Sequence, residues 1–142
     1  MRDARRHACA ALGVAMIGLL TAPAAPVAAQ QGDTLSTLDG VYTAEQAERG
    51  KATYMRVCSE CHALDYYQGT TLRAWEGAPL FDLFDVIITR MPENNPGSLR
   101  RRDYVDMMAY ILELNGMPPG EQPLPSRASA LRQIFFRWRS VS

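Results

Sequence analysis

Apolar residues recur with a period near 3.6 along much of the chain, which is the pattern of amphipathic helices. The pattern predicts three main helices, over residues 44–58, 79–89 and 98–115. The positions that would form their apolar faces are Ala47, Gly50, Tyr54, Val57, Leu80, Leu83, Phe84, Ile87, Tyr104, Met107, Met108 and Ile111.

Residues at the ends of these segments support the boundaries. Thr43 and Gln46 fit a capping box at the first helix, in which each side chain bonds the other residue's backbone N–H. Pro79 suits the first position of the second helix. Ser98 is a good N-cap for the third helix, and Gly116 is a typical stop after it.

A glycine in the first predicted helix points to a tight contact. Gly50 would cost about 1 kcal/mol relative to alanine in a helix interior. Such a glycine often marks a close approach by another element, and a merely tolerated glycine is the alternative. We expect the first and last helices to cross at Gly50, against Tyr110 or Ile111.

The hydropathy pattern at the N-terminus is that of a secretory signal peptide. Three arginines precede an uncharged run over residues 8–20, and small residues with prolines continue to Ala29. We predict a signal peptide over residues 1–29, cleaved before Gln30. A retained membrane helix is the alternative, but the apolar run is shorter than the ~20 residues that a bilayer requires.

The C-terminal end has a different character. Residues 117–126 are rich in proline and glycine and are predicted to be a linker, as are residues 30–40. Residues 127–142 form a basic tail. Within it, a short helix over 128–138 would place Leu131, Ile134, Phe135 and Trp138 on one face. Such a segment either docks on a partner or a membrane surface, or folds back on its own domain. We favour folding back on its own domain.

Composition and charge narrow the function classes. The 142 residues suffice for one domain, and 47% apolar and 21% charged residues are typical of a folded globular chain. Fifteen basic residues balance fifteen acidic ones. The chain is therefore not expected to bind nucleic acid, which requires a net basic surface.

The chemistry lies in one pentapeptide, Cys58-Ser59-Glu60-Cys61-His62. Removal of residues 1–29 would leave these as the chain's two cysteines and one histidine. The C-x-x-C-H pattern is typical of covalent attachment of a c-type haem. Cysteines three apart on a helical turn can reach two vinyl groups at one porphyrin edge, and His62 can then ligate the iron.

Three other kinds of site use a similar arrangement of cysteines. A structural zinc site requires four ligands, and the mature chain offers three clustered residues. A redox-active C-x-x-C is expected in a strand–helix–strand context, and no strongly alternating segment precedes Cys58. A structural disulfide, or chance, is the third alternative.

The iron would need a sixth ligand, for which the mature chain offers methionines. Met91 is favoured because it lies in irregular sequence between a helix and a proline turn, where backbone can present sulfur to iron. The other methionines are too close to the attachment turn, sit mid-helix, or follow a helix stop: Met55, Met107, Met108 and Met117. Trp75 is a candidate to pack on the haem edge, with ordinary core as the alternative.

Residues 41–116 closely resemble a bacterial monohaem class I cytochrome c. The matching stretches are Val41-Tyr42-Thr43, Gln46-Ala47-x-Arg49-Gly50, Cys58-x-x-Cys61-His62, Trp75-x-Gly77, Asp82-Leu83-Phe84, Met91-Pro92, Pro96-Gly97-Ser98-Leu99, Ala109-Tyr110-Ile111-Leu112 and Asn115-Gly116. The resemblance implies an all-α fold of about three main helices around one covalent haem c, with crossed terminal helices. It also implies His62 and Met91 as axial ligands.

The same resemblance implies a periplasmic electron carrier, not itself an enzyme. A periplasmic dehydrogenase would be the donor, and an oxidase or another cytochrome the acceptor. A dedicated cytochrome subunit of a dehydrogenase is the main alternative, and a haem sensor or peroxidase-like enzyme is a weaker one. One departure concerns His62. The loop that supplies an acceptor for the imidazole N–H in relatives is contracted here to residues 64–73.

Overall fold

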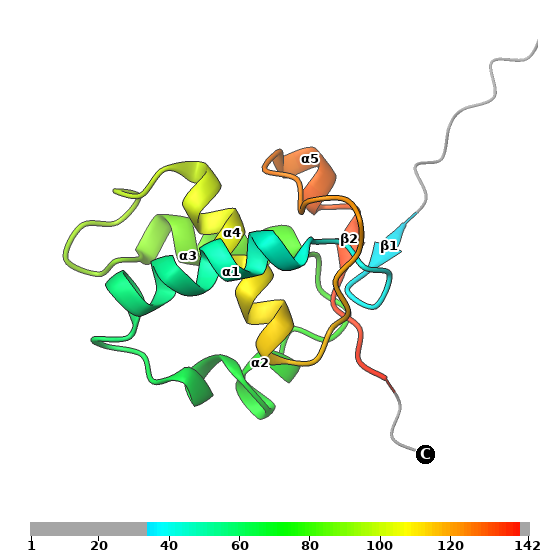
Figure 1. Ribbon diagram of the computed structural model, residues 1–142, viewed down its shortest axis with the longest axis horizontal. Coiled ribbons are helices and arrows are strands. Elements are labelled where there is room, and N and C mark those ends of the chain that lie inside the picture. The colour runs from blue at the N-terminus through cyan, green and yellow to red at the C-terminus, as the bar shows by residue number, and fades with distance from the viewer. Residues whose placement is uncertain (1–33, 140–142) are drawn as a thin grey trace, which may run out of the picture. The chain divides into compact units, whose positions relative to one another are not determined.

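The computed structural model describes residues 34–139. The predicted signal peptide lies outside the described residues, as do residues 30–33 and 140–142. The described part is mostly helical, with one small sheet of two-residue strands (Figure 1). The all-α class expected from the sequence is therefore confirmed.

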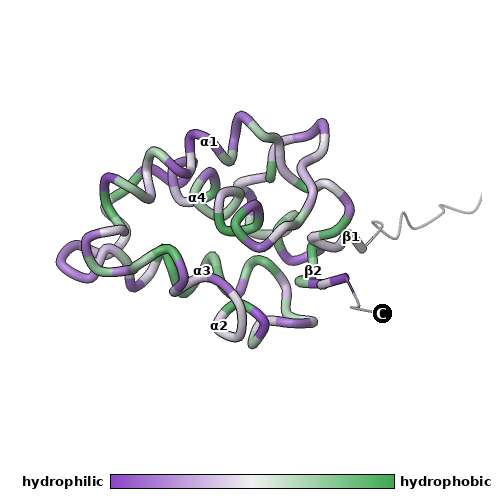
Figure 2. Tube along the Cα trace, turned by 60° about the horizontal axis from the view of Figure 1, so that its bottom comes forward, coloured by the Kyte–Doolittle hydropathy of each residue, from purple (hydrophilic) through white to green (hydrophobic). Residues whose placement is uncertain are grey.

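The elements follow one another along the chain as follows. They are β1 (Leu35–Ser36), α1 (Ala44–Thr53), the π-helix η1 (Tyr54–Cys58), the 3-10 helix η2 (Leu64–Tyr67), α2 (Thr70–Arg73), α3 (Leu80–Arg90), α4 (Arg101–Leu114), α5 (Ala128–Leu131) and β2 (Ile134–Phe135). Hydrophobic stretches of α3 and β2 are visible along the tube in Figure 2.

The first helical segment runs from Ala44 to Cys58, as predicted, but as α1 followed by η1. The Thr43 hydroxyl accepts a hydrogen bond from the Gln46 N–H at 3.2 Å, which confirms the N-cap. The second half of the predicted capping box is wrong. The Gln46 amide instead donates to the Leu124 carbonyl at 3.2 Å and accepts from the Leu124 N–H at 2.6 Å. The Gln46 side chain therefore binds the backbone of a segment that is distant in sequence, around Leu124.

α1 and α4 pack closely across Gly50. A Cβ atom at this position would overlap the backbone carbonyl of Asp106. The predicted close approach is confirmed, but its partner lies about one helical turn before the expected Tyr110 or Ile111. Beside the crossing, Arg49 Nε lies 2.9 Å from the buried carboxylate of Asp106. The lack of a side chain at Gly50 and the Arg49–Asp106 ion pair together fix how the two helices cross.

The starts of the other two main helices differ slightly from prediction. Pro79 is the N-cap of α3 and not its first residue. α4 begins at Arg101 after Arg100, so Ser98 is not its cap. Ser98 instead donates its backbone N–H to Asn95 in the preceding turn. Gly116 has a φ of +72°, which confirms it as the stop after α4.

The C-terminal residues 117–139, which we call the C-terminal clamp, fold back on their own domain. The helix predicted over residues 128–138 is wrong, because α5 ends at Leu131 and β2 follows. In β2 and just beyond it, Ile134 and Phe136 are buried while Phe135 is half-buried. This alternation arises because residues two apart on a strand share a face.

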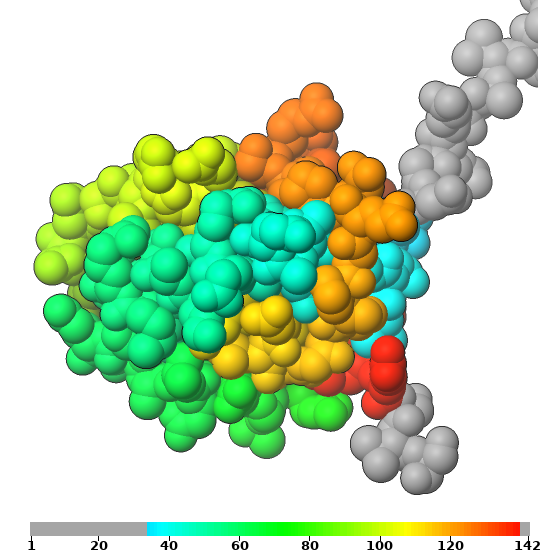
Figure 3. Space-filling view, viewed as in Figure 1, coloured from blue at the N-terminus to red at the C-terminus, as the bar shows by residue number. Residues whose placement is uncertain are grey.

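The clamp joins segments that are distant in sequence. β2 pairs in parallel with β1, so part of the predicted flexible linker over residues 30–40 is a strand. Phe136 exchanges backbone hydrogen bonds with Gly77 and Ala78 just before α3. The clamp also passes over the start of α1 (Figure 3). There, the Gly120 N–H donates to the Tyr42 carbonyl.

Candidate functional site

A cavity of about 470 Å³ opens between η1, α3 and α4. This volume is in the range of small-molecule and cofactor sites. Its walls contain four residues predicted from the sequence: Cys58, Cys61, His62 and Met91. The other lining residues are Val57, Glu60, Tyr67, Ile87, Pro92, Glu93, Asn94 and Met107. Most of the polar members lie near the attachment turn or in the turn after Met91.

Residues 58–62, which we call the attachment turn, are fixed by their own backbone. The N–H groups of Cys61 and His62 donate to the Cys58 carbonyl at 3.1 and 2.8 Å. The buried Tyr54 hydroxyl donates to the His62 carbonyl at 2.9 Å and to the Ala63 carbonyl at 3.1 Å. Burial raises the pKa of Tyr54 to about 12, so this hydroxyl keeps its proton to a higher pH than an exposed tyrosine would.

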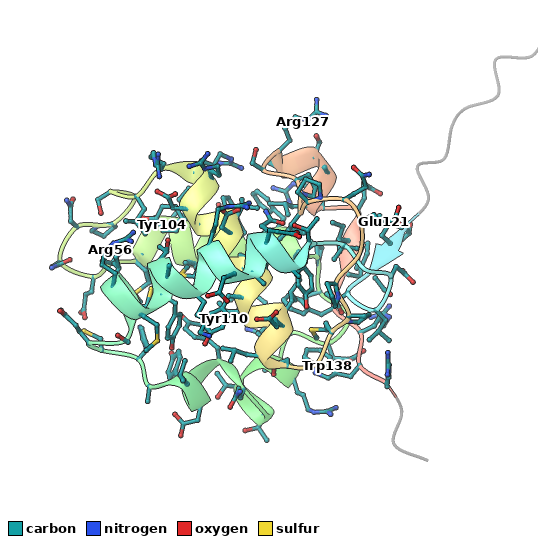
Figure 4. The ribbon with its side chains drawn as sticks, in the orientation of Figure 1. Arg56, Tyr104, Tyr110, Glu121, Arg127 and Trp138 are labelled. Atoms are coloured by element: carbon teal, nitrogen blue, oxygen red, sulfur yellow. The ribbon has the colours of Figure 1, made fainter. Side chains whose placement is uncertain are left out.

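Tyr54 is in turn held by aromatic neighbours. Its ring packs edge-on against that of Tyr110 of α4, with ring centroids 5.7 Å apart. Tyr110 is labelled in Figure 4. A second edge contact joins Tyr54 to Tyr67, at 6.1 Å. The turn that carries His62 is therefore attached to α4 as well as to η1.

The two cysteines suit thioether formation better than dithiol redox chemistry. They are not joined by a disulfide, and Cys58 is half-buried while Cys61 is exposed. Burial raises the pKa of the Cys58 thiol, and the nearby charge of Cys61 raises it further by a smaller amount. Redox-active cysteines instead have a lowered pKa, which keeps the attacking thiolate available.

Met91 is positioned by contacts from a different part of the chain. It is the C-cap of α3, in extended backbone, which confirms the irregular conformation expected there. Its N–H donates to the Ile87 carbonyl at 2.9 Å. Its carbonyl accepts a hydrogen bond at 2.7 Å from the hydroxyl of Tyr104 of α4. Tyr104 is labelled in Figure 4. The backbone of Met91 is thus held between α3 and α4.

The remaining methionines lie as follows. Met107 lines the cavity, and its sulfur lies 3.2 Å from that of Cys58. Met55 is exposed, and Met108 and Met117 are buried without lining the cavity. The cavity wall therefore contains two thioethers, Met91 and Met107.

Trp75 does not line the cavity and packs half-buried against the core. Tyr67, by contrast, is a lining residue that the sequence pattern did not single out. It belongs to η2, whose four residues are too short to show a helical period. Only its closeness in sequence to the C-x-x-C-H motif could have indicated that Tyr67 lines the cavity.

The donor set fits a haem better than a bare metal ion. Within residues 34–139, no three side chains of His, Cys, Asp or Glu converge on a common metal position. An imidazole, two thioethers and two unpaired thiols line one largely apolar cavity, as a covalently attached iron porphyrin requires. The residues present therefore fit the group that the C-x-x-C-H pattern indicates.

Comparison with known proteins agrees with this chemistry. Residues 45–111, just under half of the chain, match the family model described as cytochrome c oxidase, cbb3-type, subunit III. No curated protein and no solved structure is significantly similar to the chain. Among the described helices, none combines the length and the hydrophobicity needed to cross a bilayer. The matched region is a class I monohaem c-type cytochrome domain, with one covalently bound haem c and its iron as the cofactor.

Proposed function

We propose that this cytochrome domain is a periplasmic electron carrier with His62 and Met91 as the axial ligands of its haem iron. Cys58 and Cys61 would form the two thioether bonds. The observation that carries the proposal is that all four side chains line one cavity, although Met91 comes from a separate helix end.

The bound haem supplies one-electron chemistry between ferric and ferrous iron. The protein's own residues hold the iron ligands and limit water. Ile87, Val57 and Met107 provide apolar wall on three elements. Methionine ligation and an apolar shell both raise the reduction potential. If His62 and Met91 both bound the iron, no position would be left there for a substrate, which favours a carrier over an enzyme.

The carrier would exchange electrons with redox proteins near the attachment turn. Cys61 is exposed there, and so are the nearby apolar side chains of Met55, Leu64 and Tyr66. Redox encounters of this kind are small, below about 1,200 Å². We propose a periplasmic dehydrogenase as donor and an oxidase or another cytochrome as acceptor. The signal-peptide pattern of residues 1–29 supports export to the periplasm.

The alternative role as a dedicated dehydrogenase subunit assigned the basic tail to docking. In the structure, two of the four arginines of this tail contact their own domain. Arg132 lies 3.5 Å over the Phe81 ring, and Arg137 lies 3.8 Å from Glu76. These contacts favour the free carrier over a tail-docked subunit.

The test compares the two methionines that line the cavity. Met91→Ala is expected to abolish the ferric methionine–iron charge-transfer band and to let the reduced protein bind carbon monoxide. Met107→Leu, the matched control from the same wall, should keep the band and exclude carbon monoxide. Absorption spectra of both holoproteins measure this. A band that survives in Met91→Ala and disappears in Met107→Leu would assign the ligand to Met107 and overturn the proposal.

A further inference from the structure

The imidazole of an axial histidine needs a partner that fixes the plane of its ring. Such partners orient the ligand and tune the metal. Among residues 34–139, the His62 ring makes aromatic contacts and no hydrogen bond. The Tyr66 ring lies 4.4 Å from it, centroid to centroid, at an interplanar angle of 37°. The Tyr67 ring lies 5.7 Å away at 60°. Two tyrosines of η2 therefore flank the ring that would ligate iron.

These two tyrosines are themselves held in place. Their rings meet edge to face, with centroids 4.9 Å apart and an interplanar angle of 85°. The Asn115 amide donates to the Tyr67 carbonyl at 2.7 Å. The Gln68 amide donates to the Leu114 carbonyl at 3.2 Å. η2 is thus tied to the C-terminal end of α4, and the rings it carries are a fixed support for His62.

Exposure separates the two tyrosines. Tyr67 is 8% exposed and lines the cavity, so its position follows from core packing. Tyr66 is 49% exposed, similar to Leu64 on the same turn at 41%. Burial therefore does not explain why the Tyr66 ring lies against His62, whereas an offset aromatic contact does.

We propose that Tyr66 is a positioning residue for the axial ligand, and that its ring sets the plane of the His62 imidazole. The contact takes the place of the carbonyl acceptor in the contracted loop. The inference rests on the proposed function, because it requires His62 to ligate the iron. Tyr66 acts through His62 and does not itself touch the iron.

The test uses proton NMR of the ferric holoprotein, since the haem-methyl shifts of low-spin haem report the planes of the axial ligands. Tyr66→Ala is expected to change the order or the spread of these shifts, while the absorption spectrum stays low-spin. Tyr66→Phe keeps the ring and should retain the wild-type shifts. Leu64→Ala, a change of a similarly exposed apolar residue on the same turn, should also retain them. Thermal unfolding of each variant separates this effect from a general loss of stability.

Each outcome has a distinct meaning. Wild-type methyl shifts in Tyr66→Ala would overturn the inference while leaving His62 and Met91 as ligands. Equal changes in Tyr66→Ala and Leu64→Ala would also overturn it, because the effect would then come from the turn and not from the ring. A wild-type protein without a low-spin histidine–methionine spectrum would overturn the proposed function first.

Discussion

The two sides of the haem cavity are built in different ways. On the His62 side, the proposed attachment and ligation would come from five consecutive residues, held by backbone bonds to Cys58 and by the Tyr54 hydroxyl. On the Met91 side, the proposed ligand lies at the end of α3, and its backbone carbonyl accepts a hydrogen bond from Tyr104 of α4. The first side is local in sequence, and the second depends on how two helices pack. The Met91 side is therefore expected to respond first when packing is disturbed.

The largest expected effect comes from the C-terminal clamp. Phe136 is fully buried and bonds the segment that leads into α3. Phe136→Ala should lower the free energy of unfolding by about 3–5 kcal/mol. In denaturant, the methionine–iron band should disappear before the signature of histidine ligation, because loss of the methionine alone leaves high-spin iron with His62 still bound. Arg139→Ala, an exposed change in the same clamp, is the control. Simultaneous loss of both signatures would show that the two sides are not separable.

An intermediate effect is expected at alkaline pH, from Tyr42. Its buried hydroxyl donates to the Met117 carbonyl at 2.6 Å. Burial, with a smaller contribution from Glu113, raises the pKa of Tyr42 to about 12. Between pH ~10 and ~12 the unfolded chain loses this proton and the folded protein keeps it, so stability falls by about 2–3 kcal/mol.

The measurement is the free energy of unfolding as a function of pH, for wild type and Tyr42→Phe. The variant lacks this ionisation, so the gap in stability between the two proteins should narrow or reverse above pH ~10. Tyr42 belongs to neither side of the cavity. Removing its hydroxyl should therefore weaken the binding of both proposed ligands, His62 and Met91, to the same extent. A constant gap across this range would contradict the raised pKa.

The smallest effect isolates the Met91 side. Tyr104→Phe removes the hydroxyl that donates to the Met91 carbonyl, at a cost of about 1 kcal/mol. If that energy holds Met91 on the iron, exogenous imidazole should bind the ferric protein about five-fold more tightly. Tyr110→Phe, a buried tyrosine on the same helix, should leave imidazole affinity unchanged. Equal affinities in the two variants would mean that Tyr104 does not stabilise this side.

The difference between the two sides also explains what the sequence could predict. The attachment residues form a contiguous motif whose spacing carries its own chemistry, so Cys58, Cys61 and His62 could be found without a fold. Met91 could be selected only by comparing methionines, and Met107 in the same wall was not identified as a lining residue. The roles of all four side chains remain predictions.

The predicted fold was wrong at positions where long-range contacts decide the local structure. The Gln46 side chain bonds Leu124 and does not complete the local capping box. In the tail, Ile134 and Phe135 suited a helical face, but pairing with β1 imposed the alternation of a strand. Gly50 indicated a helix crossing correctly, although a glycine identifies the close approach and not the residue opposite.

The most direct measurement is the mass of the protein matured by cells that can attach haem, together with its pyridine haemochrome spectrum. We predict the polypeptide mass plus one haem, which remains bound after extraction with acidified acetone. Cys58→Ser combined with Cys61→Ser should release that haem. A wild-type protein with the mass of bare polypeptide, under the same maturation, would contradict the account.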